Sequence, residues 1–240
     1  APELYNPKEG RIVTANNDPY GHSENPKLSD FEDYFGIGFS TGCRAKRITE
    51  LLDANKGRID EKVVASIQLD HKDLVGERLV GVLETALAQP GFSEKLSPDA
   101  KRLVDRMLNW KATNFEARRN LKEPVLLYSW FSALSDRQFA DIKEPMGEFF
   151  EYLKNNTVAY KTVYHKLKDG LAQEASIPET LKNVTETLEI AARGLKTSNT
   201  DNSTWGEVRK LKFNNILDGI LPTALMFPIP RDGSWDTVDV

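Results

Sequence analysis

The chain of 240 residues is 40% hydrophobic, and its 32 basic and 36 acidic residues give a net charge of −4. A sizeable core can therefore form, in one large domain or two small ones. Because the basic residues are interspersed with acidic ones, we expect no nucleic-acid partner. No stretch is apolar and long enough to cross a bilayer. The single cysteine, Cys43, excludes an internal disulfide, a thiolate zinc site and an iron–sulfur cluster, and a structural buried thiol is expected.

The first element is "GRIVTA", residues 10–15, whose β-branched residues are typical of a strand. It stops at "NNDP", where Asn and Asp favour a turn and Pro19 keeps Asp18 out of the helical region. Two interpretations of the asparagine pair are open. It is either an ordinary turn or the source of an amide donor aimed at a reacting oxygen.

Helical spacing begins in "CRAKRITELLDANKG", residues 43–57, and the residues Asn55 and Gly57 indicate where that helix ends. A second helical pattern starts at Asp60, a suitable N-cap, and extends to Ala88. Its phase slips at "LDHKD", which predicts a bend there.

Three more helical segments follow. Ser97 and Pro98 predict an N-cap and a first helical residue, and "SIPE", residues 176–179, resembles a capping box. Two apolar stripes predict faces that pack into the core: Phe139, Ile142, Met146, Phe149, Phe150 and Leu153; and Ile177, Leu181, Val184, Leu188, Ala191 and Leu195.

The helical period fails after residue 197, and the chain ends in "WDTVDV", residues 235–240, a second segment that reads as a strand. Two short strands cannot form a stable sheet by themselves. The sequence therefore predicts a mostly α segment, helical over 44–196, attached to a sheet that the rest of a longer polypeptide supplies.

The residues alone indicate no self-contained catalytic site. His22, His71 and His165 are far apart and do not occur in a zinc-binding spacing. The glycines of "FGIGFSTG" do not follow the spacing of a dinucleotide or phosphate loop, and no G-x-S-x-G sequence is present.

Several stretches, taken in order, resemble the penicillin acylase (penicillin amidase) family of N-terminal nucleophile hydrolases. They are "YNPKEGRIVTANNDP", "CRAKRITELL", "IQLDHKD", "LNW", "TWGEVRKLKF" and "RDGSWDTVDV", which together span nearly the whole chain. One departure is Lys111, which follows Trp110 where the family commonly has Asp. The resemblance implies the α/β (αββα) fold of this family. Residues 1–20 would then form a strand and an active-site turn, and residues 197–240 a loop and a return strand.

In that family the nucleophile is the first Ser or Cys of the catalytic chain, freed by cleavage of a precursor, and its own α-amino group serves as base. Ala1 has no nucleophilic side chain. The resemblance therefore implies a central and later part of the catalytic (beta) subunit, expected to be inactive alone. Asn16 matches the family's oxyanion-hole asparagine. Arg47 matches the arginine that orients this asparagine and the nucleophile's amine.

Relatives usually bind calcium, and Asp30 is the local candidate ligand, with a solvated loop carboxylate as the alternative. The aromatic residues Tyr34, Phe35 and Phe39 could line an acyl pocket or pack under their loop. The expected partners are the alpha chain and the N-terminal part of the beta chain of the same precursor. The expected location is the periplasm or the exterior.

The resemblance implies an amidohydrolase that cleaves an acyl amide, as in penicillins, acyl-homoserine lactones or lipopeptides. The alternative is a non-catalytic helical module that binds a partner. Pairing of residues 11–17 with residues 235–240 as neighbouring strands that leave an unpaired edge would favour the first interpretation. Unstructured tails beside a closed helical bundle would favour the second.

Overall fold

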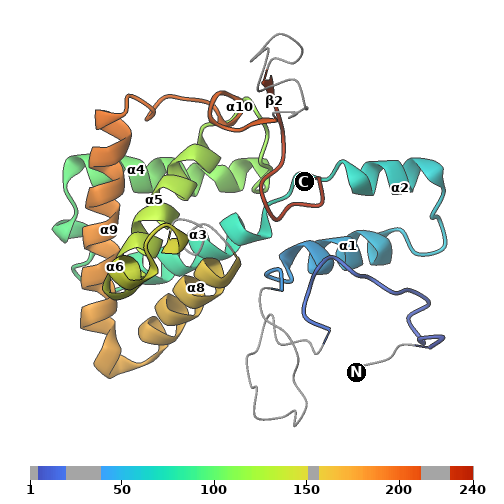
Figure 1. Cartoon of the computed structure of the whole chain (residues 1–240), viewed down its shortest axis with the longest axis horizontal. Coiled ribbons are helices and arrows are strands. Elements are labelled where there is room, and N and C mark those ends of the chain that lie inside the picture. Colours follow the sequence, from blue (N-terminus) through green and yellow to red (C-terminus); the bar gives the residue numbers. More distant parts are fainter. Residues whose placement is uncertain (1–4, 20–38, 151–156, 212–227, 240) are drawn as a thin grey trace.

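A computed structural model describes residues 5–19, 39–150, 157–211 and 228–239. The described chain is mostly helical, which confirms the predicted class. Helices α3 (Leu74–Leu87), α4 (Pro98–Leu108), α5 (Glu123–Gln138), α8 (Thr157–Ala172) and α9 (Ile177–Thr197) form a bundle. Helices α1 (Cys43–Ala54) and α2 (Glu61–Gln68) lie to one side of it, next to the N-terminal segment (Figure 1).

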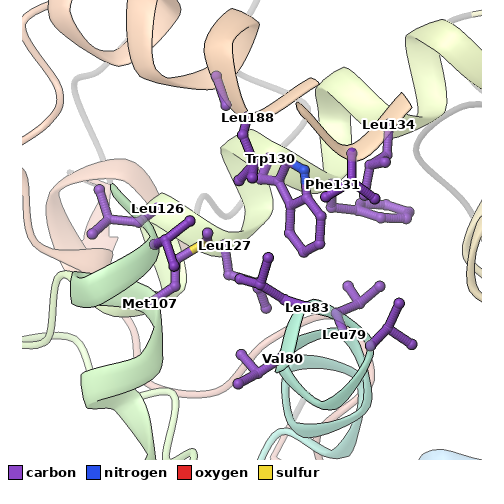
Figure 2. Close-up of a cluster of buried hydrophobic side chains, with 14 of the residues drawn as sticks. Leu79, Val80, Leu83, Met107, Leu126, Leu127, Trp130, Phe131, Leu134 and Leu188 are labelled. Carbon is purple, nitrogen blue, oxygen red and sulfur yellow. The ribbon is translucent and has the colours of Figure 1, made fainter. Parts of the chain in front are cut away.

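The bundle core forms where α5 packs along α9 and against α4, and where side chains of α5 such as Leu127 meet those of α3 (Figure 2). Figure 2 shows the side chains that meet there: Leu79, Val80 and Leu83 of α3, Met107 of α4, Leu126, Leu127, Trp130, Phe131 and Leu134 of α5, and Leu188 of α9. The Trp130 indole N–H donates to the Thr187 hydroxyl at 3.1 Å, so the polar atom of this buried ring has a partner.

Helix boundaries follow the predicted caps closely. Asp60 accepts a hydrogen bond from the Val63 N–H at 2.9 Å, and Ser97 accepts one from Ala100 at 3.2 Å. Asn55 is the C-cap of α1, and Gly57 adopts a positive φ of 77°. The segment at "LDHKD" is a full break rather than a bend, because Asp73 begins α3 by accepting from the Gly76 N–H at 2.8 Å.

Two expectations about helices were wrong. Ser176 makes no side-chain cap, and the capping box lies at Thr204 and Glu207 instead, at the start of α10 (Trp205–Val208). Residues 140–146 form only short turns, η4 (Ala140–Ile142) and α6 (Lys143–Met146), because Gly147 reverses the chain. Phe150 is buried, Ile142 and Phe149 are exposed, and Leu153 lies outside the described residues. The stripe on α9 is confirmed, with Leu181, Val184, Leu188, Ala191 and Leu195 all buried.

Strands lie elsewhere than the sequence predicts. Within the described residues the two strands are β1 (Lys210–Leu211) and β2 (Ile229–Pro230), which pair antiparallel with Lys210 opposite Pro230. Residues 10–15 and 235–239 form no strand and do not pair with each other. A strand requires a run of backbone hydrogen bonds to a neighbouring strand, and among the described residues the backbone N–H groups of 235–239 make one such contact, from Asp239 to the Asp70 carbonyl at 3.1 Å. Both segments are nevertheless held in place by side chains, as described below.

The remaining short elements connect the helices. They are η2 (Ser93–Lys95) before α4, η3 (Asn109–Thr113) after α4, and η5 (Glu174–Ser176) between α8 and α9. Trp110 of η3 is fully buried against α3, and its indole N–H donates to the Glu116 carbonyl at 2.9 Å.

Candidate active site

The asparagine turn is fixed against the start of α1. Asn16 has a φ of 57°, in the left-handed region that asparagine tolerates. Its main-chain oxygen accepts from the Ser40 N–H at 2.7 Å, and Asn17 forms a parallel bridge with Ser40. The Asn17 carboxamide oxygen accepts from the Ala15 N–H at 3.0 Å. The two asparagines thus have different functions, since Asn17 stabilises the turn through its side chain and Asn16 through its backbone.

The side chain of Asn16 is held by Arg44, in the first turn of α1. Arg44 Nη2 donates to the Asn16 side-chain oxygen and also to the Ala15 carbonyl, the latter at 2.9 Å. A guanidinium has donors only, so the carboxamide must turn its oxygen toward Arg44 and its NH₂ group away. Within the described part of the chain no acceptor is recorded for that NH₂ group. The geometry leaves an oriented amide donor available to a further group.

Arg47, three residues along α1, faces a different partner. Its Nε donates to Asp70 Oδ1 at 2.9 Å and its Nη2 to Asp70 Oδ2 at 2.8 Å, with a further contact from Nη1 to Glu50 at 3.3 Å. The hydrogen bonds that Arg47 donates to Asp70 raise the pKa of Arg47, and partial burial opposes the rise. This bidentate pair joins α1 to the break before α3. Arg44, rather than Arg47, is the arginine in contact with Asn16.

A buried polar cluster beneath α1 holds the C-terminal segment. The Thr41 hydroxyl donates to Asp236, while Thr41 Oγ1 accepts from the Cys43 N–H at 3.0 Å. Asp73 is fully buried and accepts from the Tyr128 hydroxyl at 2.6 Å. The cluster takes side chains from the start of α1, the start of α3 and residues 234–237. These contacts hold α1, the helix that carries Arg44, in place.

Burial controls the ionisation of this cluster. It raises the pKa of Asp236 to about 6, with Thr41 opposing the rise and the charge of Asp73 adding to it. Burial raises the pKa of Asp73 as well. The pKa of Cys43 rises to about 12, again through burial, so this cysteine is a protonated structural thiol and not a nucleophile.

The other predicted site residues are described only in part. Asp30, Tyr34 and Phe35 lie outside the described residues. Phe39 is described, and its carbonyl accepts from Lys161 Nζ at 3.2 Å. Among the residues that the structure describes, no group of three or more His, Cys, Asp or Glu side chains could hold a metal ion. The predicted calcium site therefore depends on Asp30 and is untested.

A family model provides the decisive comparison. The sequence model described as penicillin amidase matches residues 1–240. The chain belongs to the penicillin amidase family. No curated protein matches the sequence of the chain. Among the described residues no helix is both long and apolar enough to span a membrane.

Membership of the penicillin amidase family supports an amidohydrolase assignment for the complete protein.

Sequence reasoning alone missed Arg44 as the partner of Asn16. A signal was present, because Arg44 and Arg47 are three residues apart and therefore share one side of a helix. Sequence reasoning also missed the link between Arg47 and Asp70, although both residues lie in stretches that resemble the family.

Proposed function

We propose that this chain supplies the oxyanion donor of an acyl-amide hydrolase of the penicillin amidase type. The observation that supports this function is the orientation of Asn16, whose oxygen faces Arg44 and whose NH₂ group has no described acceptor. When the nucleophile attacks, the carbonyl oxygen of the scissile amide becomes negative. An amide N–H already aimed at that oxygen lowers the barrier by about 2.7–4 kcal/mol.

The two arginines have separate functions in this proposal. Arg44 is a positioning residue that fixes the carboxamide of Asn16 before the substrate arrives, so no reorganisation is needed as charge develops. Arg47 is a fixed cation, held by Asp70, that disfavours protonation of the nucleophile's α-amino group. That amine acts as the general base and belongs, with the nucleophile, to another segment of the processed precursor.

The remaining features of the proposal follow from family resemblance. The substrate is an acyl amide of the penicillin, acyl-homoserine lactone or lipopeptide type, and Tyr34, Phe35 and Phe39 line its acyl pocket. Calcium is bound with Asp30 as one ligand. The precursor is exported, and the alpha chain and the N-terminal part of the beta chain complete the enzyme.

Hydrolysis of chromogenic acyl anilides by the full-length processed protein tests this function. Phenylacetyl and long-chain acyl anilides represent the two main acyl classes. We expect turnover of at least one of them, and we expect the Asn16→Gly variant to lose most of it. A folded, fully processed protein that hydrolyses no acyl anilide or acyl-homoserine lactone would instead favour the helical binding module.

A further inference from the structure

A cavity of about 310 Å³ opens between α1, α3 and α8, and Asn16 is not among the residues that line it. Its walls are basic and aromatic. The lining includes Lys46 of α1, Arg78 of α3, and Tyr160, Lys161, His165 and Lys168 of α8. The ring of Tyr160 stacks on that of Tyr164 with centroids 5.6 Å apart, and the two rings form the aromatic wall.

Charge distinguishes this cavity from the rest of the protein. The chain has a net charge of −4, yet four cationic side chains line the cavity and no carboxylate does so among its described residues. Partial burial lowers the pKa of Lys161 and of His165, in keeping with a partly desolvated cavity wall, while the charges of Asp18 and Asp236 oppose the shift at Lys161. Cations gathered in a poorly solvated concave site favour an anionic ligand.

The Tyr160 hydroxyl gives a second, independent indication. Tyr160 is 1% exposed, and its buried hydroxyl oxygen makes no hydrogen bond of ordinary geometry among the described residues. Burial raises the pKa of this hydroxyl, and the Arg78 guanidinium lies close enough to oppose the rise. Most buried polar groups are paired, and an unpaired one costs stability. A hydroxyl that lines a basic cavity and has no partner is suited to donate to a ligand oxygen there.

The larger cavity between α5, α8 and α9 does not share this character. Its volume is about 710 Å³, and its lining includes Asp169 and Glu179 as well as Arg137 and Lys166. Arg137 also has partners of its own, since it pairs with Glu186 at 2.8 Å. Its mixed charges indicate no preferred ligand.

We propose that the basic cavity binds a phosphoryl group, with Lys46, Arg78 and Lys168 supplying charge and the Tyr160 hydroxyl supplying an oriented donor. A tetrahedral oxyanion presents several acceptor oxygens, which matches a site built from donors on three helices. The site does not depend on amide hydrolysis. It adjoins the asparagine turn through Lys161, which donates to the Phe39 carbonyl next to Ser40.

Calorimetric titration of the full-length protein with inorganic phosphate tests the proposal, with chloride used to keep the ionic strength constant. We expect saturable binding of one phosphate with a Kd of roughly 1 mM or below. Titration with phenyl phosphate distinguishes the two sources of a phosphoryl group. Tighter binding of phenyl phosphate identifies an organic phosphate ester as the ligand, and equal binding identifies free phosphate.

Three variants locate the site. The double variant Lys46→Gln/Lys168→Gln should weaken phosphate binding by about tenfold or more, because it removes two charge-assisted donors. Tyr160→Phe should weaken binding about three- to tenfold. Its melting temperature should be equal or higher, because it removes an unpaired buried hydroxyl. Lys166→Gln is the matched control, since Lys166 lies on α8 but lines the larger cavity.

The variants separate a specific site from general attraction to positive charge. The proposal is overturned if phosphate gives no signal beyond the chloride control. It is also overturned if Lys166→Gln weakens binding as much as the double variant, or if Tyr160→Phe leaves phosphate affinity unchanged.

Discussion

Arg44 donates from one nitrogen atom to the side-chain oxygen of Asn16 and to the carbonyl of the preceding residue, Ala15. This contact combines the two interpretations of the asparagine turn. Asn16 occupies a left-handed backbone position, as a turn residue does, and its carboxamide is oriented, as a catalytic donor must be. The two properties can be separated by substitution, because glycine adopts the same backbone conformation without the amide.

Replacement of Asn16 by glycine in the full-length processed enzyme should lower kcat by about 10²–10³ and change KM much less. The reason is that the amide bonds the oxyanion more strongly in the transition state than in the ground state. The melting temperature should change little, because glycine accepts a φ of 57°. Asn6→Gly is the matched control, since Asn6 also has a positive φ and is exposed. A near-normal kcat in Asn16→Gly would show that Asn16 acts only as a turn residue.

Substitution of the two arginines should show which of them acts through Asn16. Arg44→Lys keeps the charge but loses the planar donor that holds the carboxamide, so we expect kcat to fall about tenfold. In an Asn16→Gly background the same substitution should have little further effect, because the two changes remove one interaction. Kinetics of both single variants and of the double variant measure this coupling.

Arg47→Lys is the comparison. It breaks a bidentate pair with Asp70, so the free energy of unfolding should fall by roughly 1 kcal/mol. Its effect on kcat should be additive with Asn16→Gly. The opposite result is that Arg47→Lys is coupled with Asn16→Gly while Arg44→Lys is additive with it. In that case Arg47, and not Arg44, orients Asn16, as the family resemblance implies.

The sequence predicted the elements that depend on local chemistry. Asp60 and Ser97 were identified as N-caps because their side chains can accept from the backbone three residues later, and both do so. The apolar stripe of α9 was visible because one face of that helix is polar. The left-handed conformation of Asn16 also agrees with the turn chemistry of its residue type.

Features that depend on tertiary context were missed. Helix α5 was not singled out, because buried residues such as Leu126, Leu127 and Trp130 lie around most of its circumference and leave no clear polar face. The exposed Phe149 had the right spacing for a core residue but follows the turn at Gly147. The contact of Arg44 with Asn16 spans 28 residues, and no local pattern could distinguish it from one made by Arg47.

The buried carboxylate of Asp236 should make stability depend on pH. Its pKa is about 6 in the folded chain against 3.8 for an unperturbed aspartate side chain, so the folded state holds a proton more tightly. The stabilisation that the folded state gains from binding this proton is therefore complete below pH 3.8, and it is lost as the pH rises through 6. Asp236→Asn does not titrate. Its stability relative to the parent should rise by about 2–3 kcal/mol between pH 4 and pH 7.

Denaturant unfolding of both proteins at several pH values measures this difference directly. Asp141→Asn, at an exposed position, serves as the control for removal of a carboxylate outside the buried cluster. A difference between Asp236→Asn and the parent that stays constant, or that falls as pH rises, would contradict a raised pKa for Asp236.

Gly76 and Gly81 provide a matched pair within α3. A Cβ atom added at Gly76 would lie 2.4 Å and 2.7 Å from two ring carbons of Trp110, whereas one at Gly81 would meet nothing within 4 Å. The Trp110 ring cannot move aside easily, because it is fully buried and its indole N–H is bonded to Glu116. Gly76→Ala should therefore destabilise the protein by roughly 1–3 kcal/mol through overpacking.

Gly81→Ala should have the opposite effect and stabilise the protein by roughly 0.5–1 kcal/mol, because alanine is the better helix former at an open position. Both free energies follow from denaturant unfolding of the two variants and the parent. Both variants are Gly→Ala substitutions in the same helix, so helix propensity does not explain a difference between their free energies of unfolding. Equal effects of the two variants would mean that Trp110 of η3 does not pack against Gly76 of α3.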